Sequence, residues 1–245
     1  MDLNFIVEWF IFLCILPLHP LVFPAFLIPL LINIHRREYE STQYFKITGL
    51  PFSLVKSNPG RYGEYLIYLK LKDFAECDPQ FLFNLYIPRG NGETTEADVV
   101  MITKRGVFVF ESKNYHGWIF GNEKHPFWYQ TFENGQKQQF FNPVMQNNLH
   151  IKHIKNILHD ENIPVWSIIV FSDDCVLKEI TMETLDVSVV NREYLYSAVG
   201  SYWSYASGIN LSEEKIKEIY SKLYPYSQCS QEIREKHIFD IQNNH

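Results

Sequence analysis

Two apolar segments of this chain, DVVMI at 98–102 and VFVFESK at 107–113, are separated by the short sequence TKRG. Runs of Val, Ile and Phe joined by a short turn that contains glycine predict a β-hairpin with largely buried strands. Because side chains alternate between the two faces of a strand, Glu111 and Lys113 are expected on one face. An acid and a base on a buried strand are costly unless further contacts hold them. The hairpin therefore predicts a buried sheet with a polar site at one end.

The register of this hairpin decides which residues face each other. If Thr103 lies opposite Gly106, paired residues have numbers that add up to 209, and Asp98 lies across from Glu111. Carboxylates so placed have Cβ atoms about 4.5–5.5 Å apart and repel each other. A divalent cation removes the repulsion, because Mg²⁺ binds one or two carboxylates together with water and phosphate oxygens. A three-residue loop with a bulge at Gly106 would shift the pairing by one residue and remove this opposition.

Three further residues can complete a metal-dependent site around the hairpin. Lys113 projects from the same face as Glu111, where it can act on water or on charge that develops at a phosphoryl group. Glu64, near the start of a first expected helix, can supply another carboxylate, and Gln146, in the first turn of a second helix, can contact water or a phosphate. Taken singly, each has an ordinary alternative: a surface ion pair, a glutamate favoured by the helix dipole, and a solvated glutamine.

The composition limits the classes of function. The chain has 245 residues, of which 46% are hydrophobic and 16% aromatic, enough for one well-filled domain and an appendage. Its formal charge of −6 provides no global basic field, so contact with nucleic acid would need a local patch. The four cysteines are far apart and form no CxxC motif, which argues against a zinc ribbon or a disulfide framework and fits a reducing compartment.

The segment from Trp9 to Ile32 is almost entirely apolar, with His19 as its only strongly polar side chain. It is long enough to cross a hydrocarbon core about 30 Å thick, so we expect it to be embedded in a membrane. Arg36 and Arg37 follow it, which predicts that the rest of the chain is cytoplasmic. Four prolines leave open a kinked span, a re-entrant hairpin, or an apolar arm docked on the soluble domain. They are Pro17, Pro20, Pro24 and Pro29.

Periodicity and turn signals predict the remaining elements. The expected helices lie at 61–74, 143–159, 191–199 and 212–223, and the expected strands at 81–87, 98–102, 107–113, 117–120, 127–132, 165–171 and 187–190. The sequence SNPG before the first helix is a turn signal, and residues from about 227 form a polar tail. This order of helix, strands, helix and strand is typical of an α/β layer structure.

Other motifs add little. His150 and His153 lie three residues apart on the second expected helix, a spacing that can share a metal ion, but no carboxylate stands at the matching helical position. We therefore expect both histidines to face solvent. The aromatic residues between 115 and 129 can stack on unpaired bases, although core packing is the expected role. The sequence has no GxSxG, Walker or GxGxxG motif to indicate acyl transfer, nucleotide hydrolysis or dinucleotide binding.

Several stretches between residues 60 and 172 together resemble the nuclease-related domain (NERD), a branch of the PD-(D/E)XK restriction-endonuclease-like superfamily. They are GEYLIYL, FNLYIPRGNGETTEADVVMITKRGVFVFESKNYHGWIFG, FWYQ and FFNPVMQNNLHIKHI. The resemblance implies an α/β fold with a restriction-endonuclease-like mixed sheet flanked by helices. The active-site positions implied by this likeness are Glu64, Asp98, Glu111 and Lys113, with Gln146 as an accessory residue. Ala97 stands where the family usually has a proline.

The resemblance also implies a function. We expect a membrane-anchored cytoplasmic nuclease that hydrolyses phosphodiester bonds in nucleic acid, with DNA as the expected substrate. Glu64, Asp98 and Glu111 would bind Mg²⁺, with Mn²⁺ as the alternative, and Lys113 would assist attack by water. The alternatives are a catalytically inactive nucleic-acid-binding or scaffolding module at the membrane, and a sensor whose target is a membrane partner. The expected organisation is a membrane-embedded segment at 1–34, a linker at 35–58, the nuclease-related domain at 59–190, and a helical extension with a polar tail at 191–245.

Overall fold

The computed structural model of the chain describes residues 22–76, 78–89 and 92–243. By their contacts the residues form two compact units, divided between Lys46 and Ile47. Helix α2 (Val22–Ser41) belongs to the first unit. Residues 9–21 of the expected membrane segment lie outside the described residues, and none of the described helices is both long and apolar enough to cross a bilayer.

The second unit is built on a five-stranded mixed sheet with the strand order β1-β2-β3-β7-β9. Its strands are β1 (Gln80–Pro88), β2 (Thr94–Thr103), β3 (Gly106–Lys113), β7 (Val165–Phe171) and β9 (Val187–Asn191). The first three are antiparallel, whereas β3, β7 and β9 run parallel. Parallel strands need a crossover connection, and α6 (Pro143–Leu158) lies in the connection from β3 to β7.

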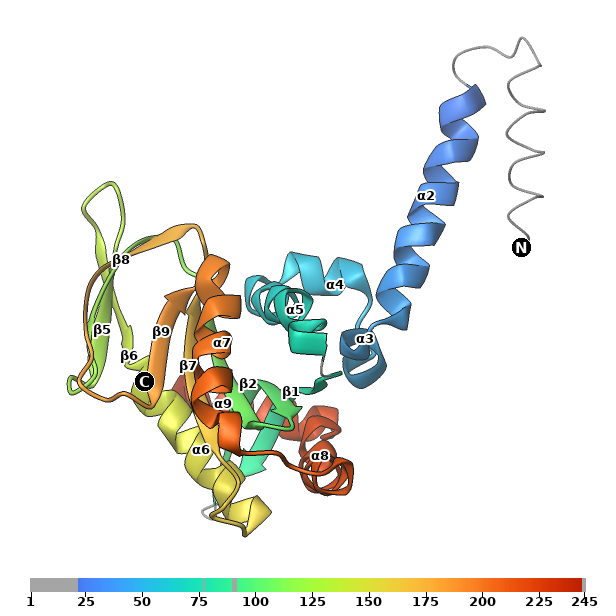
Figure 1. Cartoon of the computed structure of the whole chain (residues 1–245). Coiled ribbons are helices and arrows are strands. Elements are labelled where there is room, and N and C mark those ends of the chain that lie inside the picture. Colours follow the sequence, from blue (N-terminus) through green and yellow to red (C-terminus); the bar gives the residue numbers. More distant parts are fainter. Residues whose placement is uncertain (1–21, 77, 90–91, 244–245) are drawn as a thin grey trace. The chain divides into compact units, whose positions relative to one another are not determined.

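Helices cover both faces of this sheet. Tyr68 of α5 (Pro59–Leu71) packs its ring against Phe81 and Phe83 of β1, with centroids 5.2 and 5.8 Å apart. On the opposite face, Ile154 of α6 and Leu223 of α8 (Glu213–Ser227) join one core cluster with strand residues. In Figure 1, α5 lies above β1 and β2, and α8 lies below them. The expectation of a mixed sheet flanked by helices is therefore confirmed.

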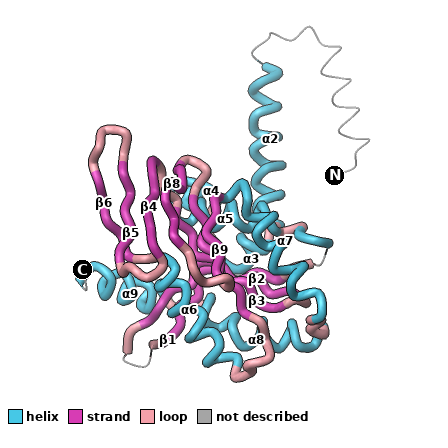
Figure 2. The backbone as a smooth tube through the Cα atoms, turned by 60° about the vertical axis from the view of Figure 1, so that its left-hand side comes forward, coloured by secondary structure: helices cyan, strands magenta, loops and turns pink. Residues whose placement is uncertain are grey.

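A second sheet of four strands has the order β6-β5-β4-β8, visible side by side in Figure 2. It consists of β4 (Gly117–Asn122), β5 (Phe127–Thr131), β6 (Lys137–Phe141) and β8 (Cys175–Thr181). Fully buried Trp128 of β5 stacks on Phe171 of the main sheet, with ring planes 4° apart. Strands β6 and β8 are absent from the elements expected from the sequence, because most of their side chains are exposed and leave no clear apolar alternation.

The hairpin has the first of the two registers that the sequence left open. Thr103 pairs with Gly106 and Val99 with Phe110, so β2 and β3 are joined by a two-residue turn. Gly106 has a φ of +120°, and a Cβ built there would meet the Pro164 carbonyl oxygen at 2.6 Å. A side chain at this position is therefore excluded twice, by conformation and by space. The bulged three-residue alternative is excluded by the observed pairing.

Several segments expected to be irregular are helical. Helices α3 (Gln43–Thr48) and α4 (Phe52–Ser57) lie in the range expected as a linker, and α9 (Gln231–Asn243) lies in the expected polar tail. The SNPG sequence is the start of α5, because the Asn58 side chain accepts a hydrogen bond from the Arg61 amide. The remaining elements are α7 (Leu195–Tyr205) and three short 3₁₀ segments, Phe74–Glu76, Arg192–Tyr194 and Ala206–Gly208.

Candidate active site

The end of β3 carries a buried acid and a buried base that contact α6. Glu111 is 1% exposed, and its Oε1 accepts a hydrogen bond from Lys113 Nζ at 2.6 Å. Lys113 Nζ also donates to Gln146 Oε1 at 3.0 Å. Gln146 lies in the first turn of α6, where Asn142 caps the helix with its side chain and Pro143 occupies the first position. The capped start of α6 therefore fixes the glutamine that holds the lysine.

Strands β1 and β2 both change face at the position of the next acid. Leu82 and Leu85 are three residues apart yet belong to the same core cluster, whereas strict alternation would place them on opposite faces. The change falls at Asn84, which has a φ of +50° and lies opposite Asp98 in the register of the two strands. This distortion places Asp98 at a break in the pairing of β1 with β2 and just beyond the last paired residue of β2 and β3.

Asp98 and Glu64 are each held by a neighbour. The Ser112 amide of β3 donates to Asp98 Oδ2 at 2.8 Å, and Asn84 Nδ2 donates to Glu64 Oε2 at 2.9 Å. Glu64 is 6% exposed and comes from α5, on the face of the sheet opposite α6. Burial, followed by the negative charges of Glu111 and Glu64, raises the pKa of Asp98 well above its ordinary value. The three acids therefore belong to one electrostatic site.

The ion pair on β3 is charged in spite of its burial. Burial alone would raise the pKa of Glu111, but the charge of Lys113 and the hydrogen bond from His150 outweigh it, so this pKa is lowered. Burial would likewise lower the pKa of Lys113, but the charges of Glu111 and Asp98 outweigh it, so this pKa is raised. Lys113 is therefore a protonated ammonium at neutral pH.

His150 is part of this site, and the expectation that it faces solvent is wrong. It is 2% exposed, with Nε2 at 3.2 Å from Glu111 Oε2 and Nδ1 at 2.7 Å from Thr95 Oγ1. The sequence contains a signal for this burial, because His150, Ile154 and Leu158 recur every four residues along one face of α6, and the two apolar members are core residues. His153, the other histidine, is partly exposed.

The donor set fits a hard divalent cation. Carboxylate oxygens are the ligands that Mg²⁺ prefers, and the pKa of Asp98 is raised first by burial and then by the negative charges of Glu111 and Glu64. Within the described residues, no group of three or more His, Cys, Asp or Glu side chains is already arranged to hold a metal ion. Both oxygens of Glu111 accept hydrogen bonds, one from Lys113 and one from His150.

Comparison with known proteins agrees with the geometry. The sequence model of the nuclease-related domain matches residues 59–172, a range that includes all five expected site residues. An uncharacterised protein of Bacillus anthracis is 30% identical over 184 residues, which cover 75% of this chain and 84% of that protein. No solved structure shows a significant match to the chain.

Proposed function

This chain belongs to the nuclease-related domain family, and on that premise we propose that it hydrolyses phosphodiester bonds in nucleic acid with the help of a divalent metal ion. The observation that carries the proposal is that Asp98, in the middle of β2, lies close to Glu111 and Lys113 at the end of β3. An acid pair at one point of a sheet disfavours folding, and packing alone gives no reason for it. A function that needs concentrated negative charge beside a cationic donor explains why the two acids lie so close together.

Asp98 and Glu111, with Glu64, would hold Mg²⁺, or Mn²⁺ as the alternative. When bound, such an ion neutralises charge on a phosphate and lowers the pKa of a water molecule. The raised pKa of Lys113 makes it a donor of hydrogen bonds to phosphate oxygens at neutral pH rather than a general base. Gln146 orients that ammonium through its amide oxygen. The nucleophile is water, and the bond that breaks is a phosphorus–oxygen bond of the backbone.

Cleavage by the full chain in mild detergent tests the proposal directly. Plasmid and linear DNA, each with Mg²⁺, are expected to be cut by the wild type and left intact by Lys113→Ala and by Asp98→Asn. Cleavage of either DNA is followed on agarose gels. RNA of the same sequence, tested in the same way, shows whether the protein prefers DNA. The proposal fails if the wild type leaves DNA and RNA intact, or if both variants cut as fast as the wild type.

We also propose that residues 9–32 anchor the protein in a membrane, with the main unit in the cytoplasm. The support is the apolar sequence of that segment and the position of Arg36 and Arg37 after it. Two reporters are fused after Tyr39, one that is active only in the cytoplasm and one that is active only outside it, and we expect activity from the first alone. Activity of the second reporter contradicts the orientation. A full chain that stays in the supernatant after high-speed centrifugation contradicts the membrane anchor.

The second candidate is a catalytically inactive module that binds nucleic acid or acts as a scaffold. One observation favours it: Lys113 and His150 already satisfy both carboxylate oxygens of Glu111, so the pair can serve as a structural ion pair. In that case the wild type and Asp98→Asn bind DNA equally and neither cuts it. Binding measured next to cleavage therefore separates the two functions.

A further inference from the structure

A pocket of about 210 Å³ lies beside Glu64, outside the group formed by Asp98, Glu111 and Lys113. Its lining comes from the start of α5, from β1 and β2, and from α9, and four of the lining side chains are charged. These are Arg61, Glu64, Glu96 and Arg234. The pocket therefore joins the candidate active site to the C-terminal helix, which lies beyond the region matched by the family model.

Helix α9 is fixed to the edge of the sheet by polar contacts. Lys236 Nζ donates to the Gly92 carbonyl oxygen at 2.7 Å, and His237 Nδ1 lies 2.9 Å from Thr94 Oγ1. One contact joins α9 to the first residue of β2, and the other joins it to the loop two residues before that strand. Arg234, one turn away on the same helix, is thereby held at the pocket. The packing of α9 on the sheet therefore sets the position of Arg234.

Arg234 keeps most of its donors for a ligand. Its guanidinium lies over the ring of Tyr86, 5.9 Å from the centroid, and its Nε donates to Cys229 Sγ at 3.5 Å. Glu96 Oε2 lies 3.7 Å from His237 Nε2, and in the part of the chain that the structure describes no carboxylate forms a salt bridge with Arg234. A guanidinium has five N–H donors in a planar fork, which suits the oxygens of a phosphate.

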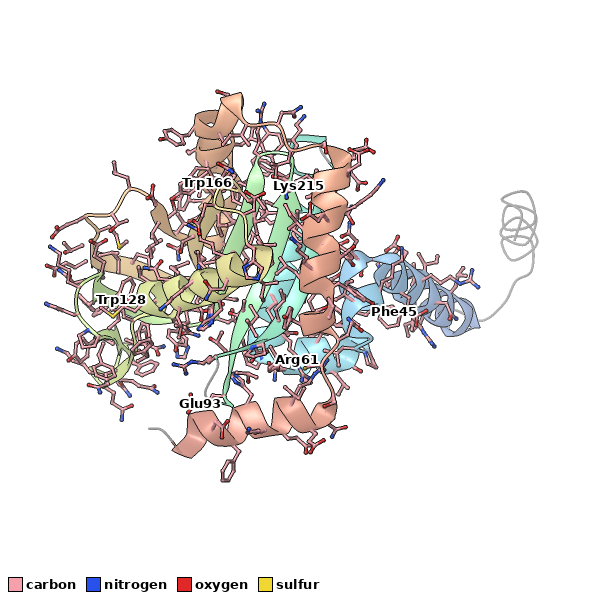
Figure 3. The ribbon with its side chains drawn as sticks, turned by 90° about the horizontal axis from the view of Figure 1, so that it is seen from below. Phe45, Arg61, Glu93, Trp128, Trp166 and Lys215 are labelled. Carbon is pink, nitrogen blue, oxygen red and sulfur yellow. The ribbon has the colours of Figure 1, made fainter. Side chains whose placement is uncertain are left out.

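Arg61 places a second guanidinium on the same pocket. It belongs to the first turn of α5, and Figure 3, where it is labelled, shows it in the same region as α9. The two arginines offset the charges of Glu64 and Glu96, so that an anion can enter without net repulsion. A stacked base is a poorer occupant, because Phe83 is 1% exposed and Arg234 already covers the ring of Tyr86.

We propose that this pocket binds a backbone phosphate of the nucleic-acid strand, next to the bond that the active site would cut, and that Arg61 and Arg234 are its phosphate-binding residues. The inference rests on the proposed function. It extends the substrate site beyond the matched domain, since Arg234 lies in α9. Phosphate contacts of this kind position the strand and do not read its sequence.

Binding without turnover tests the proposal. The full chain in mild detergent and EDTA is titrated against a short fluorescein-labelled single-stranded DNA, and fluorescence anisotropy gives the dissociation constant at several NaCl concentrations. Arg234→Gln is expected to weaken binding about tenfold and to reduce the slope of log K against log salt by about 0.7. Arg61→Gln should do the same. Lys217→Gln, which removes one exposed charge from α8 outside the pocket, should change neither quantity appreciably.

Three results overturn the proposal: no binding by the wild type, an unchanged salt slope in Arg234→Gln, or an equal loss in Lys217→Gln. Inorganic phosphate at constant ionic strength should compete with the DNA for the wild type and not for Arg234→Gln, because it would occupy the same donors. If Arg234→Gln melts well below the wild type, Arg234→Lys replaces it and should keep the slope but lose affinity, because the charge stays and the fork is lost.

The measurement also separates this pocket from the proposed function. A wild type that binds DNA with an Arg234-dependent slope but cuts nothing upholds the pocket and contradicts hydrolysis. A wild type that cuts DNA, while Arg234→Gln binds like the wild type, upholds hydrolysis and contradicts the pocket.

Discussion

At the scale of single residues, Glu111 is the centre of the candidate site. A carboxylate that is 1% exposed is stable only if its oxygens are satisfied, and here each oxygen has its own partner. In a neutral imidazole, an Nε2–H that donates to Glu111 leaves Nδ1 to accept the hydroxyl proton of Thr95. Glu111, which can only accept, therefore selects the tautomer of His150, and the Thr95 hydroxyl donates to the other ring nitrogen. The ring, held from both sides, fixes the orientation of Glu111.

His150→Ala is expected to lower kcat for DNA cleavage about 10- to 100-fold while KM stays nearly constant, because a positioning contact of this kind acts on Glu111 and not on the strand. His150→Gln, which can still donate a hydrogen bond, should recover part of the loss. His153→Ala on the same helix is the matched control, and its kinetics should equal those of the wild type. An equal kcat in His150→Ala and the wild type contradicts the positioning role.

Asp98→Asn is expected to stabilise the metal-free fold while it abolishes cleavage. The pKa of Asp98 is raised in the folded state, so the contribution of this group to stability is full below its unfolded pKa and is lost as pH rises through the folded pKa. The ionised acid therefore destabilises the fold at neutral pH. The asparagine removes that charge, keeps an acceptor for the Ser112 amide, and should add about 1 kcal/mol to the free energy of unfolding.

Thermal unfolding in EDTA between about pH 4 and about pH 8 measures this effect. The difference in melting temperature between Asp98→Asn and the wild type should grow as the pH rises and should vanish at the acidic end of this range. A variant that melts below the wild type at neutral pH would show that the acid stabilises the fold, and the electrostatic account of the site would be wrong.

At the scale of elements, the distortion in β1 is what allows α5 to share the site with β2. Asn84 adopts a left-handed conformation that asparagine tolerates better than most residues, and its amide holds Glu64. Asn84→Gly adopts this conformation without strain and loses only the hydrogen bond, whereas Asn84→Ala loses the hydrogen bond and is strained in the same conformation. We expect the alanine variant to be less stable than the glycine variant by about 1 kcal/mol.

Urea unfolding of the two Asn84 variants measures this difference, and cleavage rates report on Glu64. Both variants should lose the same fraction of activity, since both leave Glu64 without the amide donor. Equal stability of the two variants would mean that the backbone at this position is not strained. Unequal activity at equal stability would mean that the strand conformation, and not the amide, sets the position of Glu64.

Elements whose signal is local could be predicted from the sequence. Strand β7 (Val165–Phe171) was predicted with its observed bounds because it is a continuous apolar run, and α6 because Asn142 and Pro143 mark its start. The sequence left two hairpin registers open, because Gly106 suits both a two-residue turn and a bulged loop, and the observed pairing is the first. Strands β6 and β8 were missed because they pair at an exposed sheet, where strand pairing replaces apolar alternation as the stabilising contact. Helix α9 was missed because polar anchors hold it.

At the scale of the whole molecule, the candidate site is the place where both helical layers reach the end of one hairpin. Glu64 comes from one face, Gln146 and His150 from the other, and the hairpin acids lie between them. The sequence could supply Asp98, Glu111 and Lys113, because two adjacent strands carry them. The burial of His150 can be read from its spacing with Ile154 and Leu158, but its contact with Glu111 cannot. The roles of Asn84 and Arg234 could not be predicted, because they depend on a backbone distortion and on the docking of α9.

Mg²⁺ is therefore expected to stabilise the whole fold by binding to the native site. A ligand that binds only the folded state adds about 2.7 kcal/mol at a concentration one hundred times its dissociation constant, so the melting temperature of the wild type should rise with Mg²⁺. In EDTA, Asp98→Asn should have a higher melting temperature than the wild type, and added Mg²⁺ should not raise it further. Added Mg²⁺ should therefore reduce or reverse the difference in melting temperature between the two proteins. Asp186→Asn removes an exposed acid between β8 and β9 and should keep the full response. Differential scanning calorimetry across a Mg²⁺ series measures all three. An equal Mg²⁺ response in the wild type and Asp98→Asn would show that the acids at the end of the hairpin do not bind the ion, and the lysine beside them would then be a structural partner alone.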